Sequence, residues 1–191
     1  PACMSLGLLA TAVPAQGPTL VKDINTTVSS SGGANPNYSR PYPNNCYNPT
    51  FLRKIPYIYF SAQTIAAGNE PWISAGTQAS TKMLADINPG PASSSPYGFT
   101  LSNDGKKLFF RATSATAGAE VYVCDLTVTP LKCTLLADLN PGTPGSSASY
   151  FAPIGPSSVV FYATTATTGY ELFISDGTAA GTKLLKDIYA G

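Results

Sequence analysis

The chain has 191 residues, of which 43% are apolar and only 11% are charged, and its net charge is +1. This length supports one domain with a buried core, and the apolar content excludes a disordered chain. The few lysines and arginines form no basic cluster, which excludes electrostatic binding to nucleic acid. Histidine, the commonest general base and metal ligand, does not occur. We therefore expect a protein that is not an enzyme and needs no cofactor.

The first segment of the chain, residues 1–17, is an apolar arm without charge. Its run CMSLGLLATAVPA has thirteen residues, too few for a helix that crosses a bilayer, so no membrane span is expected. The run is similar to the end of a secretory signal, with Val13-Pro14-Ala15 at the position of a cleavage site. No basic region precedes it, which favours an arm that stays in the mature protein. Both alternatives remain open.

An internal repeat begins after the arm. Four segments share one pattern: TLVKDIN at 19–25, KMLADINPG at 82–90, TLLADLNPG at 134–142 and KLLKDIYAG at 183–191. Three of them are preceded by a second pattern: GNEPWIS at 68–74, GAEVYVC at 118–124 and GYELFIS at 169–175. A third, aromatic and β-branched pattern occurs as YIYFSA at 57–62, LFFRAT at 108–113 and VVFYAT at 159–164. The repeat unit is therefore about 50 residues long.

Each unit is predicted to contain four short strands. In the middle unit these strands are expected at 97–102, 107–113, 120–125 and 133–139, with a tight Asp-Gly hairpin at 103–105. Strands at this period are typical of β-propeller blades. We expect an all-β domain over 18–191 made of three four-stranded propeller-like blades, with an extra N-terminal strand and the extended arm. A β-sandwich built from the same meanders is the alternative.

The expected units of this domain span approximately 18–87, 88–139 and 140–191. The first unit also contains an insertion at 26–50 that is rich in Pro, Asn and Ser. Such a composition is typical of a linker rather than of a packed strand.

The last unit resembles a known repeat. Its sequence from Tyr170 to Ile188, YELFISDGTAAGTKLLKDI, is similar to the ELWxSDGTxxGTxLVKDINPG repeat of large secreted bacterial proteins. The first unit matches through Glu-Pro-Trp-Ile-Ser and Ala-Gly-Thr, whereas the middle unit has CDLTVTPLKC at 124–133 in place of the SDGT turn. The resemblance covers roughly 18–191 and implies an extracellular, propeller-like array. It implies no particular activity.

Four cysteines without C-x-x-C spacing indicate disulfides rather than a zinc site. Cys124 and Cys133 flank the last hairpin of the middle unit and are expected to bridge it. By elimination, Cys3 is expected to pair with Cys46 and so to hold the arm on the insertion. Four cysteines allow three pairings, and a bond from Cys3 to another subunit is the alternative.

Seven acidic residues occupy equivalent positions in the repeat: Asp23, Asp86, Asp138, Asp187, Glu70, Glu120 and Glu171. Paired carboxylates suit glycoside hydrolysis or calcium binding. One copy in each unit instead indicates a structural role, such as accepting backbone N–H groups in turns. Trp72, Tyr122 and Phe173, also equivalent, are expected in the core between units rather than in a sugar-binding platform.

The strand count predicts assembly. The pattern of the last strand occurs four times in three units, so the strand at 19–25 has no unit of its own. Closed propellers have about four to eight blades, and an unpaired apolar strand is a liability unless it is covered. Addition to the sheet edge of another copy would cover it, and a head-to-tail contact that does not close makes a filament.

We therefore expect an extracellular structural protein that self-assembles by strand addition into a filament or surface layer. Its partners are other copies of itself in a head-to-tail homopolymer. Apolar residues of the arm and of the first strand are expected to make the contact: Leu6, Leu8, Leu9, Val13, Leu20, Val21 and Ile24. The alternative is a β-propeller-type adhesion or binding module that recognises a glycan or a protein surface. A secreted hydrolase with an acid pair in one cleft is a third hypothesis.

Overall fold

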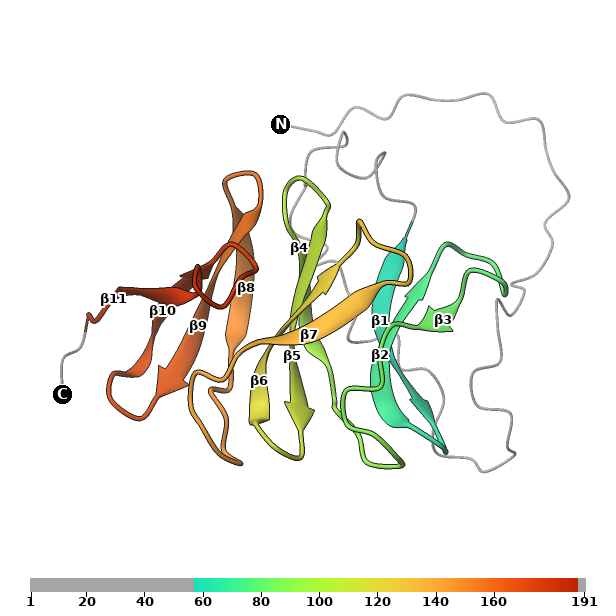
Figure 1. The fold of residues 1–191 in the computed structure, drawn as a ribbon, viewed down its shortest axis with the longest axis horizontal. Helices are drawn as coiled ribbons and strands as arrows, with labels where there is room; N and C mark the ends of the chain where they lie inside the picture. Colours follow the sequence, from blue (N-terminus) through green and yellow to red (C-terminus); the bar gives the residue numbers. More distant parts are fainter. Residues whose placement is uncertain (1–56, 189–191) are drawn as a thin grey trace, which may run out of the picture.

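The computed structural model describes residues 57–188. All the regular secondary structure in this range is β-strand. The strands form three antiparallel sheets that lie side by side along the molecule (Figure 1). This confirms the predicted all-β class. The expected arm, the strand at 19–25, the insertion at 26–50 and the proposed Cys3–Cys46 bond lie outside the described residues.

Each sheet is a meander in which strands adjacent in sequence pair with each other. The first sheet contains β1 (Ile58–Thr64), β2 (Gly68–Ser74) and β3 (Lys82–Met83). The second contains β4 (Tyr97–Leu101), β5 (Lys107–Ser114), β6 (Gly118–Asp125) and β7 (Lys132–Ala137). The third contains β8 (Ser149–Ile154), β9 (Ser158–Thr165), β10 (Gly169–Ser175) and β11 (Lys183–Lys186).

The register of the sheets corrects one part of the repeat alignment. Ile58 pairs with Ser74, as Leu108 pairs with Cys124 in the second sheet. The segment equivalent to LFFRAT therefore begins at Ile58, and the expected match from Tyr57 is one residue out of register. The error arose because Tyr57 and Ile58 are both apolar, so the sequence pattern fits either register.

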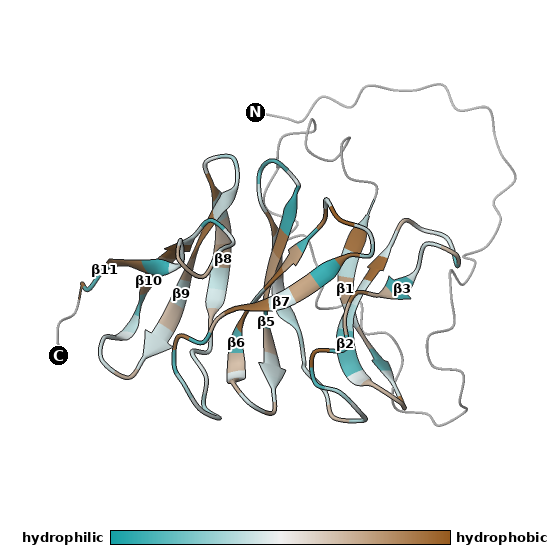
Figure 2. Ribbon diagram, in the orientation of Figure 1, coloured by the Kyte–Doolittle hydropathy of each residue, from teal (hydrophilic) through white to brown (hydrophobic). Residues whose placement is uncertain are grey.

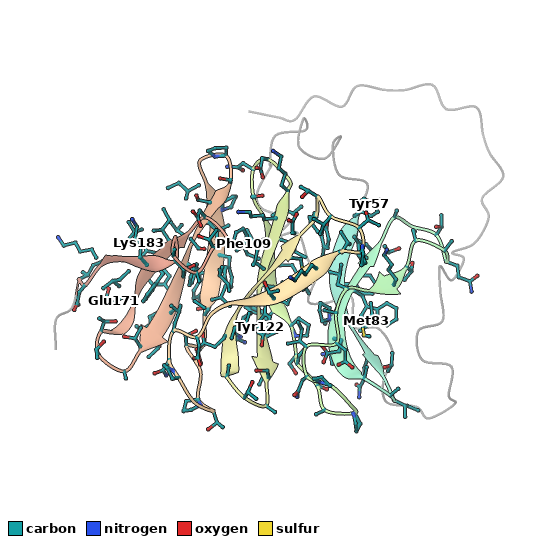
Figure 3. All side chains as sticks on the ribbon, viewed as in Figure 1. Tyr57, Met83, Phe109, Tyr122, Glu171 and Lys183 are labelled. Atoms are coloured by element: carbon teal, nitrogen blue, oxygen red, sulfur yellow. A yellow bond between two sulfur atoms is a disulfide. The ribbon has the colours of Figure 1, made fainter. Side chains whose placement is uncertain are left out.

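The second sheet is buried on both faces. One of its faces places Phe109 and Val121 in a cluster with Phe161 of the third sheet. The other face places Phe110 with Tyr59 of the first sheet. Figure 3 shows Phe109 where the second and third sheets meet, and Figure 2 shows apolar residues concentrated along the strands. Two cores between three sheets therefore hold the described residues together.

The expected core position between sheets is confirmed for Tyr122 and Phe173, whereas Trp72 is buried within the first sheet alone. Trp72, Tyr122 and Phe173 are all buried. Tyr122 belongs to the cluster between the first two sheets, and Phe173 belongs to the cluster between the last two. Trp72 packs with Phe60 on the other face of the first sheet.

Candidate assembly surface

A buried glutamate ties each of the first two sheets to the linker that follows it. The Glu120 carboxylate accepts hydrogen bonds from the backbone N–H groups of Asn140 (3.1 Å) and Ser146 (2.8 Å) and from the Ser146 hydroxyl (2.5 Å). The Ser146 carbonyl then accepts the N–H of Thr164 in β9 at 2.8 Å. This chain of bonds sets the position of the third sheet against the second.

The same arrangement recurs one unit earlier. Glu70 accepts the N–H groups of Ile87 (2.8 Å) and Ser94 (2.9 Å) and the Ser94 hydroxyl (2.7 Å), and the Ser94 carbonyl accepts the N–H of Thr113 in β5. Burial raises the pKa of Glu70 and of Glu120, although the hydrogen bonds act in the opposite direction. These contacts agree with the structural role expected for two of the seven repeated acids, Glu70 and Glu120. Residues 57–188 contain no group of three or more side chains placed to hold a metal ion.

A cross-strand pair closes the last hairpin of every sheet. In the first sheet the hydroxyls of Ser74 and Thr81 are 2.7 Å apart, and in the third sheet those of Ser175 and Thr182 are 2.8 Å apart. The second sheet has the expected Cys124–Cys133 disulfide at the same position. The disulfide therefore replaces a hydroxyl hydrogen bond of the repeat.

The third sheet presents an exposed apolar face. The face of the second sheet that contacts the third contains Phe109, Val121, Val123 and Leu136, and all four are buried. The register makes their equivalents Val160, Leu172, Ile174 and Leu185. The first three are only partly buried and Leu185 is 49% exposed, because no further sheet follows within 57–188. Contiguous exposed apolar residues are typical of interaction sites.

Three tyrosines cover part of this face. Tyr150, Tyr162 and Tyr170 are 74%, 38% and 49% exposed. The rings of Tyr162 and Tyr170 stack with their centroids 5.3 Å apart, and Tyr150 meets Tyr162 edge-on at 6.3 Å. The Tyr170 hydroxyl lies 2.7 Å from the hydroxyl of Ser149. Neighbouring strands thus hold the three rings as one connected group, which we call the tyrosine face.

The second sheet has different residues at these positions. Its equivalents of Tyr150, Tyr162 and Tyr170 are Gly98, Arg111 and Ala119. The sequence analysis missed this surface because it aligned the residues that the units share. A difference between the units would have revealed it, because the last unit has tyrosines at three positions where the preceding unit has none.

Gly98 shows what the second sheet requires at this position. Gly98 has a φ of 76°, and a Cβ there would lie 2.9 Å from the Phe151 ring of the third sheet. The glycine therefore lets the aromatic ring of the following unit approach the backbone. In the third sheet Tyr150 adopts a φ of 54° with a full side chain. Such a conformation costs about 1–3 kcal/mol in a non-glycine residue and is found mostly at functional positions.

The close approach at Gly98 yields a prediction. Gly98→Ala is expected to lower the free energy of unfolding by about 2–3 kcal/mol, because it combines a positive φ with an overpacked contact. Gly76→Ala is the matched control, since Gly76 has a φ of 83° but no neighbouring atom within 4 Å of its Cβ position. Urea unfolding measures both variants. Equal losses would show that Phe151 imposes no constraint.

A cleft of about 410 Å³ lies between the first two sheets. The side chains of Tyr57, Tyr59, Lys82 and Val128 contribute to its lining, together with the disulfide-closed loop at 126–131. Burial, and then the neighbouring Tyr57, raises the pKa of Tyr59 to about 12, so its hydroxyl stays protonated at neutral pH. The volume is in the range of small-ligand sites.

No protein-family model matches the chain, and no curated protein matches it. The resemblance to the ELWxSDGT repeat therefore stays a prediction. Within residues 57–188, no helix could span a membrane.

Proposed function

We propose that this protein is an extracellular structural protein whose copies assemble head to tail into a filament or surface layer. In this proposal the three sheets are blades of a propeller-like array. The observation that carries it is the exposed tyrosine face of the third sheet, at a position where the equivalent face of the second sheet is a buried core.

The packing of the sheets supports this function. Both junctions between sheets use the same glutamate–linker contact, so the described units form a regular series. Residues 57–188 form three sheets, fewer than the about four to eight blades of a closed propeller, and the exposed face of the third sheet is apolar. Covering that face with another copy removes it from water, and a contact between unlike surfaces propagates when it does not close.

Extracellular location is part of the same proposal. The protein has a disulfide, Cys124–Cys133, and disulfides form and persist mainly in oxidising environments such as the extracellular space. The low charge content leaves the surface polar but nearly uncharged, which suits close association of copies. In this account Glu70 and Glu120 bind linkers rather than a substrate, and we propose no enzyme activity for the protein.

A binding module for a glycan or a protein surface is the second candidate function. The cleft between the first two sheets favours it, because small-ligand sites combine aromatic side chains with a few polar groups, and this cleft has two tyrosines, Ser80 and Lys82. This candidate predicts a monomer that binds a glycan through the cleft.

The first experiment measures the mass of the purified full chain by light scattering over a range of concentrations, with negative-stain electron microscopy beside it. We expect the mass to rise well above the 19.8 kDa of one chain, and we expect elongated particles or sheets. A protein that stays at 19.8 kDa at high concentration would refute self-assembly, and glycan screens would then test the second function.

A further inference from the structure

We propose that the tyrosine face of the third sheet binds the apolar N-terminal arm, residues 1–17, of a second copy. This inference rests on the self-assembly proposed above and names the contact that makes it. It also replaces the expected addition of a strand to a sheet edge with the packing of a segment on a sheet face.

The tyrosine face is not shaped for a fourth sheet of the same kind. In the second sheet, Gly98 leaves room for the Phe151 ring of the next sheet. At the equivalent position Tyr150 has a side chain of its own, which occupies the space that such a ring would need. An occupant without that ring, such as an extended segment, fits this face better than another blade.

The chemistry of the face suits an apolar, uncharged segment. Tyrosine provides a large and rigid apolar surface with a hydroxyl at its rim, and it is enriched at the centre of protein interfaces. The same face of the sheet also presents apolar side chains beside the rings, from Val160, Leu172 and Ile174. The arm offers leucines and a valine without any charge that would have to be buried unpaired: Leu6, Leu8, Leu9 and Val13.

The edges of the third sheet are poorer acceptors than its face. β11 is the edge strand, and it begins and ends with the exposed lysines Lys183 and Lys186. Lysines on an edge strand oppose the addition of a further strand. Figure 3 shows Lys183 at the outer side of the third sheet. At the other edge, β8 contacts β4 of the second sheet.

The length of the chain before the described residues allows the arm to reach a second copy. Residues 18–56 separate the arm from Tyr57. A chain of this length spans up to about 130 Å when extended, at roughly 3.3–3.6 Å per residue. One arm and one tyrosine face per copy give a contact between unlike surfaces, as a head-to-tail polymer requires.

Two full-length variants test the contact. The face variant carries Tyr150→Gly, Tyr162→Arg and Tyr170→Ala, and so has the residues that the second sheet already accommodates. The arm variant carries Leu6→Asp, Leu8→Asp and Leu9→Asp. We expect each variant alone to stay near 19.8 kDa in light scattering, because each lacks one half of the contact. We expect an equimolar mixture to form a heterodimer of twice that mass, since one intact arm then meets one intact face.

The controls separate this inference from the proposed function. Tyr57→Ser removes an exposed tyrosine of the cleft, away from the face, and is expected to assemble like the unmodified chain. Near-UV circular dichroism checks that the face variant keeps its packing. If the unmodified chain assembles and both variants do so as well, the arm–face contact is wrong while self-assembly stands. A mixture that stays monomeric also overturns the contact, and a monomeric unmodified chain overturns both proposals.

Discussion

Glu120→Ala is expected to lower the free energy of unfolding by roughly 3–5 kcal/mol, the largest loss for any single substitution proposed for this protein. The substitution leaves the buried N–H group of Ser146 and the partly buried N–H group of Asn140 without their acceptor and removes the partner of the Ser146 hydroxyl. It also loosens the linker whose Ser146 carbonyl binds Thr164 of the third sheet. Urea unfolding monitored by fluorescence and circular dichroism measures the loss.

Glu120→Gln is the matched control. Its amide oxygen can still accept both N–H groups, and its NH₂ group can donate to the Ser146 hydroxyl oxygen, so we expect a loss of about 1 kcal/mol or less. If the alanine and glutamine variants were equally stable, the hydrogen bonds of Glu120 would contribute nothing and the linker would be held by packing alone.

The difference in stability between the unmodified protein and Glu120→Gln is expected to depend on pH. Burial raises the pKa of Glu120 above its ordinary value of 4.5. The native state therefore binds the proton more tightly than the unfolded chain does. The stability from this residue is fully present below pH 4.5 and is lost as the pH rises through the raised pKa. We expect the unmodified protein to lose stability relative to Glu120→Gln as the pH rises above 4.5. A difference that is constant with pH would contradict the raised pKa.

Removal of the Cys124–Cys133 disulfide is expected to lower the free energy of unfolding about as much as Gly98→Ala does. The bond closes a short loop, with a sequence separation of 9, so Cys124→Ala with Cys133→Ala should cost about 2–3 kcal/mol. Cys124→Ser with Cys133→Thr should recover about 1 kcal/mol of this loss, because the other two sheets have a serine–threonine hydrogen bond at the same position.

Urea unfolding of both double variants and of the unmodified protein, with and without a reducing agent, measures these differences. The unmodified protein should lose more stability on reduction than either double variant, because only the unmodified protein has the Cys124–Cys133 bond to break. A serine–threonine variant no more stable than the alanine variant would show that the hydroxyl pair does not transfer to the longer hairpin of the second sheet.

The amino-acid sequence by itself determined the local features of this protein. The aromatic and β-branched segments, the Asn103-Asp104-Gly105 turn and the period of about 50 residues predicted the meanders, because these signals act between residues close in the chain. Cys124 and Cys133 could be paired from the sequence since they flank one hairpin. The burial of Tyr122 and Phe173 between sheets was also predictable, because both are aromatic residues at equivalent positions of the repeat.

Only the tertiary structure decided which surfaces are covered. Val160 and Phe109 are both apolar and occupy equivalent positions. Phe109 lies between two sheets, whereas Val160 lies on a face that no further sheet covers within the described residues. The bonds from Glu120 to Ser146 join residues 26 positions apart, and no local pattern encodes that distance. The tyrosine face depends on β8, β9 and β10 lying side by side in one register, so its three rings meet only once the sheet has formed.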